Sequence, residues 1–451
     1  MTYAEAIQFL YSLRLFGAKF GLENTRKLAA LAGSPQEKLR FIHVAGTNGK
    51  GSTCAMLESI YRAAGLRVGL FTSPHLVSFR ERIQVNRQLI SENDVVRLVA
   101  ELRRTGVAPV SDLIFTKENK TDGDRRDACP TFFEFVTVMA LKFFAEQKCD
   151  LVIWETGLGG RLDATNIVMP LASVITNISF DHQQWLGDTL EKITAEKAGI
   201  IKPGVPAITA AEAPEALSVI EKIALQNHAR LVVVGQASRL SPFEKKDSET
   251  GATPVLRLLG DHQKLNAALA LATVEILQPQ IPVAKEKIRA GLAGVNWPGR
   301  LQLVQKPGGQ KILLDGAHNV AGAEALRATL EKNFAGATPL LIFGALADKN
   351  WPEICRILAP LAARIFTVPV ASERSADANA LAQVFRSANP SAEVAAFENL
   401  SAAINASKDE PFVVITGSLY LVGEALERLG FSPATTGERG LNEWGASQIP
   451  R

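Results

Sequence analysis

The sequence predicts an α/β protein with a larger N-terminal domain and a smaller C-terminal domain. Short apolar runs alternate with helical patterns along most of the chain, which is typical of a parallel sheet covered by helices on both faces. The alternation ends at a Pro-Gly turn in VNWPGR (295–300) and then starts again. With 451 residues, the chain is also long enough for two or three domains of about 150 residues each.

The N-terminal domain is expected to span residues 1–296. An amphipathic helix in MTYAEAIQFLYSLRLF comes first and lacks the basic start of a signal peptide. The expected strands lie in FIHVA, LRVGLFTSP, CDLVIWETGLGG and ASVITNISFDH, and the expected helices in STCAMLESIYRAAG, DVVRLVAELRR and FEFVTVMALKFFAEQ. The polar segment 116–130 interrupts this order, so we expect an exposed insertion loop there.

The C-terminal domain is expected to span residues 297–431 and to be Rossmann-like. Its expected strands lie in LQLVQ, KILLDGAHN, PLLIFGAL, RIFTVPV and PFVVITGSLY, with helices at about 321–332 and in WPEICRILAPLA and LVGEALERL. Residues 432–451 have little periodicity and are expected to form a flexible tail.

Composition excludes several classes of protein. The net charge of +3 is small for this length, so neither a nucleic acid nor a membrane surface is an expected partner. No apolar stretch is long enough to cross a bilayer. The four cysteines lack metal-binding spacing, which favours free thiols in a reducing cytoplasm.

The segment HVAGTNGKGST (43–53) has the context of a phosphate-binding loop, with a strand before it and a helix after it. Its glycines allow the backbone to approach an anion, and the helix N-terminus adds a favourable dipole. Lys50 could pair with the outer phosphates, and Ser52 or Thr53 could help to hold a magnesium ion. The alternative is a glycine-rich turn with a solvated lysine.

Polar side chains follow three further expected strands, and ligands of open α/β sheets bind at such strand ends. These are Ser73 in FTSPHL, Glu155 in LVIWETGLGG, and Asp181 with His182 in SFDH. Magnesium prefers oxygen ligands, which suits the serine and the carboxylate. The alternatives are a turn serine, a salt bridge from Glu155 to Arg161, and a structural histidine.

Lys197 in EKAGI is expected on a helix, where a solvated lysine is the default interpretation. If Lys197 is buried near two metal ions, it must be neutralised or modified, because an ammonium beside cations is strongly disfavoured.

The remaining candidates lie near or beyond the domain junction. Asn266 in HQKLN could contact a base or a phosphate, and Arg300 in WPGR could bind a phosphate through two hydrogen bonds. Asp315 and His318 in DGAHN follow a strand, and Asp315 could accept a hydrogen bond from a ribose. Ser418 in TGSLY could bind a carboxylate or simply cap a helix.

As a set, these motifs resemble the folylpolyglutamate synthase/dihydrofolate synthase family of the Mur ligase superfamily, over about residues 1–430. The motifs in order are HVAGTNGKGST, FTSPHL with RERI, PTFFE, ETGLGGRLDATN, SFDH, LGDTLEKITAEKAGI, HQKLN, WPGR, DGAHN and TGSLY. The resemblance implies a P-loop ATPase domain of the Mur ligase type followed by a glutamate ligase domain. The charged segment 116–130, just before PTFFE, departs from the family pattern.

The resemblance implies ATP-dependent amide ligation through an acyl phosphate, with dihydropteroate or a folate and L-glutamate as substrates. It implies ATP contacts from Asn48, Gly49, Lys50, Gly51, Ser52, Asn266, Arg300 and Asp315. It implies magnesium at two sites, with Ser73, Glu155 and His182 as ligands, and a carbamylated Lys197. It implies substrate contacts from Thr131, Phe132, Leu158, Gly159, Gly160, Arg161, Asp163 and Ser418, a catalytic role for Lys50, Lys197 and His318, and a cytoplasmic monomer.

Two alternatives stay open at this point. A peptidoglycan-type Mur ligase would act on a UDP-sugar peptide, but only about 45 residues precede Lys50, too few for the extra N-terminal domain of such enzymes. A nucleotide-binding switch or simple ATPase would need neither DGAHN nor EKAGI.

Overall fold

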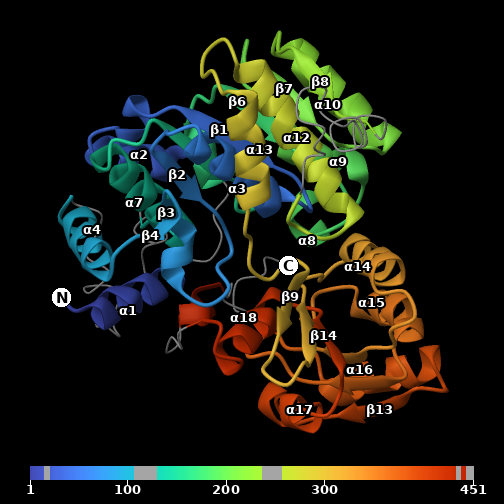
Figure 1. Cartoon of the computed structure of the whole chain (residues 1–451). Coiled ribbons are helices and arrows are strands. Elements are labelled where there is room, and N and C mark those ends of the chain that lie inside the picture. Colours follow the sequence, from blue (N-terminus) through green and yellow to red (C-terminus); the bar gives the residue numbers. More distant parts are fainter. Residues whose placement is uncertain (15–20, 106–128, 236–255, 433–437, 443–451) are drawn as a thin grey trace.

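The computed structural model describes residues 1–14, 21–105, 129–235, 256–432 and 438–442. These residues form two α/β units, blue to yellow and orange to red in Figure 1. The predicted α/β architecture is therefore confirmed. No helix in these ranges is long and apolar enough to cross a membrane.

The sheet of the first unit has the order β4-β3-β2-β5-β1-β6-β7-β8. Its strands are β1 (Phe41–Ala45), β2 (Val68–Phe71), β3 (Ile83–Val85), β4 (Gln88–Leu89), β5 (Leu151–Glu155), β6 (Ala172–Ile175), β7 (Ala207–Thr209) and β8 (Leu231–Val233). Every residue of β1 is buried, as expected for a central strand covered on both faces. At one edge, β3 pairs antiparallel with β2 and β4 pairs antiparallel with β3, and the sequence did not predict this hairpin.

The helices of the first unit cover both faces of this sheet (Figure 1). They are α1 (Tyr3–Leu13), α2 (Glu23–Leu31), α3 (Lys50–Ala63), α4 (Glu92–Arg104), α7 (Phe132–Glu146), α8 (Gln183–Leu186), α9 (Leu190–Ala198), α10 (Pro214–Gln226), α12 (Asp261–Leu277) and α13 (Lys285–Gly294). The short 3-10 helices are η2 (Pro35–Lys38), η3 (Phe79–Arg82) and η4 (Ala164–Ile167). One core lies under α3, α12 and α13, and another joins α1, α4 and α7 on the opposite face.

The sheet of the second unit has the order β13-β12-β11-β14-β10-β9, with only β9 antiparallel among these described strands. The strands are β9 (Gln302–Gln305), β10 (Lys311–Leu314), β11 (Leu340–Phe343), β12 (Arg364–Thr367), β13 (Glu393–Ala396) and β14 (Phe412–Thr416). The helices are α14 (Val320–Asn333), α15 (Trp351–Leu358), η5 (Ala359–Leu361), α16 (Ala378–Ala388), α17 (Leu400–Ala406) and α18 (Leu419–Arg428). Helices α14, α15 and α16 cover one face, and α17 and α18 cover the other.

The prediction of a flexible tail from residue 432 onward is wrong for one described segment. A 3-10 helix, η6 (Glu438–Asn442), packs against α1 and η3 of the first unit. Leu441 is buried in the core there, and Glu438 and Asn442 are buried polar residues that form hydrogen bonds. These tertiary contacts order a segment that has no periodicity of its own. Of the expected insertion loop, residues 116–128 lie outside the described residues, whereas residues 129 and 130 are buried.

Candidate active site

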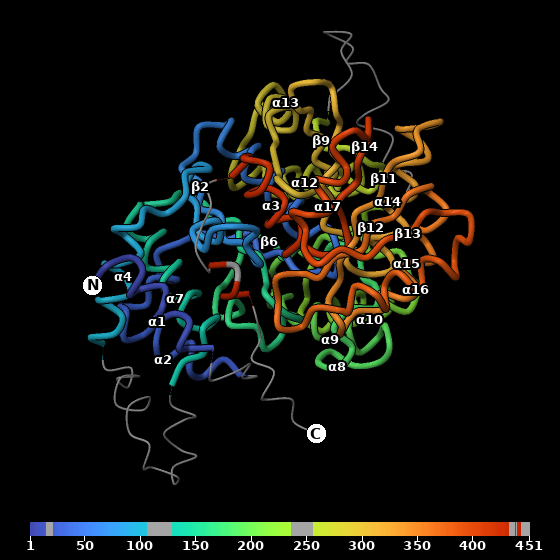
Figure 2. Tube along the Cα trace, turned by 90° about the horizontal axis from the view of Figure 1, so that it is seen from below, coloured from blue at the N-terminus to red at the C-terminus, as the bar shows by residue number. Residues whose placement is uncertain are grey.

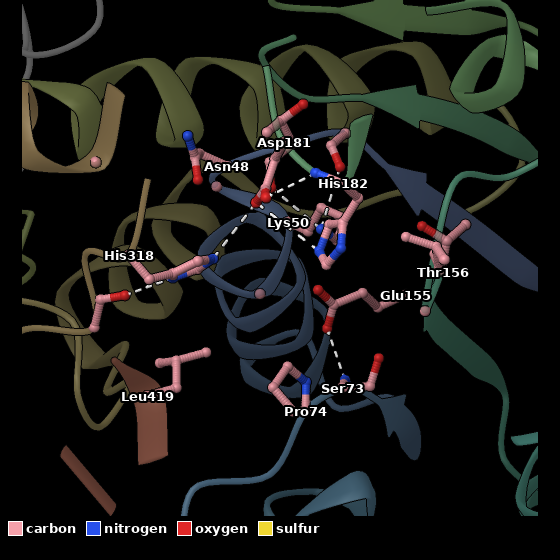
Figure 3. A pocket seen from close by; sticks show the side chains of 18 of the residues that line it. Asn48, Lys50, Ser73, Pro74, Glu155, Thr156, Asp181, His182, His318 and Leu419 are labelled. Carbon is pink, nitrogen blue, oxygen red and sulfur yellow. Dashed lines mark hydrogen bonds and ion pairs between the residues drawn. The ribbon is translucent and has the colours of Figure 1, made fainter. Parts of the chain in front are cut away.

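The predicted strand-end residues meet at one edge of the first sheet. Strands β2, β5, β1 and β6 are parallel neighbours, so their carboxyl ends lie side by side. Ser73 follows β2, Glu155 ends β5, the glycine loop follows β1, and Asp181 follows β6. Together with residues of the second unit, they line one cavity of about 390 Å³ (Figure 3).

The glycine loop has the backbone conformation that an anion cradle requires. Gly49 has φ +86° and caps α3, which begins at Lys50. A side chain at Gly49 would place its Cβ only 2.3 Å from Oδ1 of Asn266, so the loop tolerates no larger residue there. The Nζ of Lys50 donates to the carbonyls of Gly46 at 3.1 Å and Thr47 at 3.2 Å, which holds the ammonium over the loop.

Asn48 connects this loop to the second unit. Its backbone N–H donates to Oδ1 of Asn177, which fixes the loop to the segment after β6. Its side-chain amide exchanges two hydrogen bonds with Asn319, at 3.2 and 3.0 Å. Asn319 is the N-cap of α14, so the loop and the second unit share a direct polar contact.

Glu155 is a buried carboxylate that faces the cavity. Its Oε2 accepts the backbone N–H of Ser73 at 3.1 Å. Burial raises the pKa of Glu155 to about 7, although Lys50, the Ser73 amide and Arg300 partly oppose this shift. A carboxylate in this environment would gain much from a cation beside it.

Lys197 is buried rather than solvated, so the default interpretation of this residue is wrong. Its exposed fraction is 5%, and its Nζ donates to the carbonyl of Gly46 at 2.8 Å. Burial, with a further contribution from Lys50, lowers the pKa of Lys197 to about 7. Near neutral pH, Lys197 is therefore a neutral amine in a large fraction of the protein molecules.

Asp181 forms a charged cluster between the two units. Its Oδ1 accepts Nζ of Lys349 at 2.6 Å, and its Oδ2 accepts Nδ2 of Asn319 and lies 3.6 Å from Nε2 of His318. Burial alone would raise the pKa of Asp181, but His318, His182 and Lys349 outweigh burial and hold that pKa well below its usual range. The Nδ1–H of His318 donates to the carbonyl of Gly316, which directs Nε2 toward Asp181 (Figure 3).

The remaining ATP candidates line the same cavity. Asn266 donates to Oε1 of Gln263, which in turn donates to Ser52. Asp315 accepts the backbone N–H groups of Leu301 and Ala317, so it also fixes the turn that carries Arg300.

Most of the predicted substrate residues also line the cavity, but two do not. Thr131, Phe132, Leu158, Gly159, Asp163 and Ser418 are lining residues. Thr131 and Ser418 are N-caps of α7 and α18, and Asp163 accepts the N–H groups of Gly157 and Leu158, so each has a structural task as well.

Gly160 and Arg161 lie outside the lining. Gly160 packs against the end of α9, where a Cβ would lie 2.8 Å from the Lys197 carbonyl. Arg161 is 55% exposed and pairs with Glu196 at 2.8 Å, not with Glu155. The structure therefore does not bring Gly160 and Arg161, which the resemblance implies as substrate contacts, to the cavity wall.

Comparisons with known proteins agree with this arrangement. Residues 44–274 match the family model "Mur ligase middle domain", and residues 299–419 match "Mur ligase, glutamate ligase domain". A dihydrofolate synthase/folylpolyglutamate synthase of Bacillus subtilis is 37% identical over 95% of this chain and 99% of its own length. The chain belongs to the folylpolyglutamate synthase/dihydrofolate synthase family of Mur ligases.

Two solved structures of this family resemble the whole chain. FolC of Escherichia coli in complex with DHPP and ADP has a TM-score of 0.80 and 30% identity, over 96% of this chain and 98% of that one. Folylpolyglutamate synthase of Mycobacterium tuberculosis complexed with ADP has a TM-score of 0.82 and 29% identity, over 96% of this chain and all of that one.

The expected metal ligands Ser73, Glu155 and His182 all line the cavity. Figure 3 shows Glu155 and His182 facing the same space beside Lys50, with Ser73 next to Glu155. Within the described residues, no three His, Cys, Asp or Glu side chains form a metal cluster by themselves. The raised pKa of Glu155 and the hydroxyl of Ser73 suit a hard cation that takes its other ligands from phosphate oxygens and water.

Sequence reasoning missed four cations on the cavity wall, namely Arg14, Arg82, Lys349 and Arg374. Lys349 lies in the segment after β11, so the strand-end rule applied to the second sheet would have found it. Arg374 lies between β12 and α16 and pairs with Asp348 at 3.2 Å, and no motif marked it.

Proposed function

We propose that this protein joins L-glutamate to dihydropteroate, and also to the γ-glutamyl chain of reduced folates, through an acyl-phosphate intermediate. Family membership makes the chain an ATP-dependent ligase that attaches glutamate in folate metabolism. The observation that most supports the proposal is the convergence of the Lys50 loop, Glu155 and Lys197 with the second unit on one cavity.

The first step is transfer of the γ-phosphoryl group to the acid. The loop amides and Lys50 would hold the phosphates of ATP, and Ser52, Asn266, Arg300 and Asp315, which line the same cavity, would contact the rest of the nucleotide. A carboxylate oxygen of the acid attacks the γ-phosphorus, the bond to the bridging oxygen breaks, and ADP leaves. Magnesium held by Ser73, Glu155 and His182 would neutralise the charge that develops on the phosphoryl oxygens.

The second step forms the amide. The neutral amine of glutamate attacks the acyl carbon, phosphate leaves, and the amine gives up a proton. Lys349 and Arg374 bring positive charge to the part of the cavity formed by the second unit, where glutamate carboxylates need partners. Ser418 and His318 lie on the same side, so we assign them to the binding of glutamate or the acyl phosphate.

Lys197 is proposed to be carbamylated. Its neutral amine would form an N–C bond to CO2 and release one proton, which leaves an anionic, carboxylate-like carbamate. The buried position beside Lys50 favours this change, because two ammonium groups would otherwise repel each other. The carbamate would support a second magnesium site.

Substrate incubations test the proposal. Purified protein receives ATP and L-glutamate with dihydropteroate or, separately, with a reduced folate, and products are separated by mass. Amide product in both mixtures supports both activities, and product in only one removes the other. ATP turnover without either acid would instead favour the nucleotide-switch alternative. We also propose that the protein is a cytoplasmic monomer and that its domain boundary lies near residue 296. The elution volume in size-exclusion chromatography tests the oligomeric state.

A further inference from the structure

The C-terminal helix η6 lies at the substrate cavity although it follows the whole second unit in sequence. Figure 2 shows a short red segment near the blue and teal helices of the first unit. Leu441 and Asn442 line the cavity together with Arg82 and Phe132. The helix therefore contributes to the wall of the cavity itself.

Polar contacts fix η6 to the loop after β2. Oε2 of Glu438 accepts the N–H of Phe79 at 2.7 Å and the hydroxyl of Ser78 at 2.9 Å. Nδ2 of Asn442 donates to the carbonyl of His75 at 2.9 Å. The loop and the helix thus hold each other at both ends of η6.

These contacts set the position of the Arg82 guanidinium. Nη2 of Arg82 donates to Oδ1 of Asn442. Nε of Arg82 donates to Nδ1 of His75 at 2.9 Å, which requires a lone pair on Nδ1. The carbonyl of Glu438 provides this tautomer, because it accepts the Nε2–H of His75 at 2.9 Å. Helix η6 therefore orients Arg82 directly through Asn442 and indirectly through His75.

The surroundings of Arg82 suit it to bind an anionic ligand. It is 3% exposed, and its hydrogen-bond partners His75 and Asn442 are neutral groups. Burial lowers the pKa of Arg82 to about 10, and the nearby Glu81 and Glu155 carboxylates oppose this shift only in part. Its guanidinium lies 5.4 Å from the centre of the Phe132 ring, on the wall of the cavity. A buried cation whose charge is only partly offset by its surroundings gains from a ligand that brings negative charge.

We propose that η6 is a positioning element for the acid substrate, in which Asn442 and Glu438 hold Arg82 where it binds the carboxylate-bearing part of that substrate. This inference rests on the proposed function for the identity of the acid. It makes Asn442 a positioning residue for substrate binding, at the opposite end of the chain from the nucleotide loop.

Kinetics of the full-length Asn442→Ala variant test this inference. We expect the KM for dihydropteroate to rise about tenfold, the loss expected for one charge-assisted hydrogen bond, with the KM for ATP within twofold of wild type. Arg428→Ala is the matched control, because Arg428 is 57% exposed on α18 and pairs only at 3.6 Å with Glu424. It should leave both constants unchanged.

A second variant guards against a folding effect. A Cβ at Gly440 would lie 1.5 Å from the Tyr11 hydroxyl, so Gly440→Ala forces η6 and the Tyr11 side chain apart without altering Asn442 or Arg82. It should raise the same KM. A thermal melt shows whether each variant is folded. The inference is overturned if either folded variant keeps the KM for dihydropteroate within twofold of wild type. It is also overturned if the KM for ATP rises by the same factor as the KM for dihydropteroate.

The two proposals fail in different ways. If the wild type forms no amide from dihydropteroate, the proposed function is wrong. In that case, the affinity of wild type and of Asn442→Ala for dihydropteroate can still be compared by equilibrium binding, measured through the fluorescence of dihydropteroate. Equal affinities there would overturn the role of η6.

Discussion

Carbamylation of Lys197 can be tested through the acidity that the structure gives this side chain. Burial lowers the pKa of Lys197 from 10.5 to about 7. At pH 8, about 90% of such side chains are neutral amines, against roughly 0.3% of ordinary lysines. Because only the neutral amine attacks CO2, Lys197 should react roughly 300-fold more readily at equal intrinsic nucleophilicity.

The assay is 13C NMR of the protein equilibrated with 13C-bicarbonate. Wild type should show a carbamate carbonyl signal, which Lys197→Arg should lose together with most of its kcat. Lys192→Arg is the control on the same helix, since Lys192 is 62% exposed and pairs with Asp188. The signal should weaken as the pH falls through about 7, because protonation removes the nucleophile.

Two results would refute this reasoning. One is a wild-type spectrum identical to that of Lys197→Arg at pH 8. The other is a Lys197→Arg variant that keeps its kcat within twofold, which would show that a permanent cation is tolerated beside Lys50.

Three further predictions concern charges on or near the cavity. Lys50→Ala should lower kcat on the order of 10²–10³-fold, because it removes the cation held over the loop; near-normal product formation would exclude the phosphate-loop assignment. Lys349→Met should raise the KM for L-glutamate about tenfold, because the cavity loses an ammonium that we propose as a partner of a glutamate carboxylate, while Lys332→Met, at an exposed lysine, should not; an unchanged KM would remove Lys349 from the amine site. Arg161→Ala should keep kcat and all KM values within twofold, because Arg161 lies outside the cavity lining; a large rise in the KM for dihydropteroate would restore the original interpretation from sequence.

The strand-end motifs could be predicted because each of them is defined by residues that are adjacent in the sequence. Each polar residue directly follows an apolar run, and parallel strands bring those positions together whatever lies between them. Ser73, Glu155 and the glycine loop line one cavity, as this rule predicts for residues at neighbouring strand ends. The same rule predicted only a loop at 157–163, because sequence does not tell which way each loop side chain faces. Gly159 therefore lines the cavity while Arg161 points to solvent.

The part that sequence could not predict depends on tertiary contacts. Helix η6 has no apolar repeat, and its order comes from hydrogen bonds to a loop more than 350 residues earlier in the chain. Likewise, the burial of Lys197 depends on its packing against the carbonyl of Gly46, whereas the EKAGI pattern alone suggests an exposed helix face. In both cases the decisive partner is distant in sequence.

The polar contacts between the two units indicate how nucleotide and amine chemistry are coupled. Asn48 belongs to the nucleotide loop through its backbone, yet its side chain binds Asn319 of the second unit. Asn319 also donates to Asp181, which holds Lys349 on the proposed glutamate side. A change of the loop that breaks the Asn48–Asn319 hydrogen bonds would therefore also disturb the contacts that hold Asp181 and Lys349. Each of these hydrogen bonds joins a residue of the first unit to a residue of the second unit. Separation of the units would therefore disrupt the proposed nucleotide site and the proposed glutamate site together.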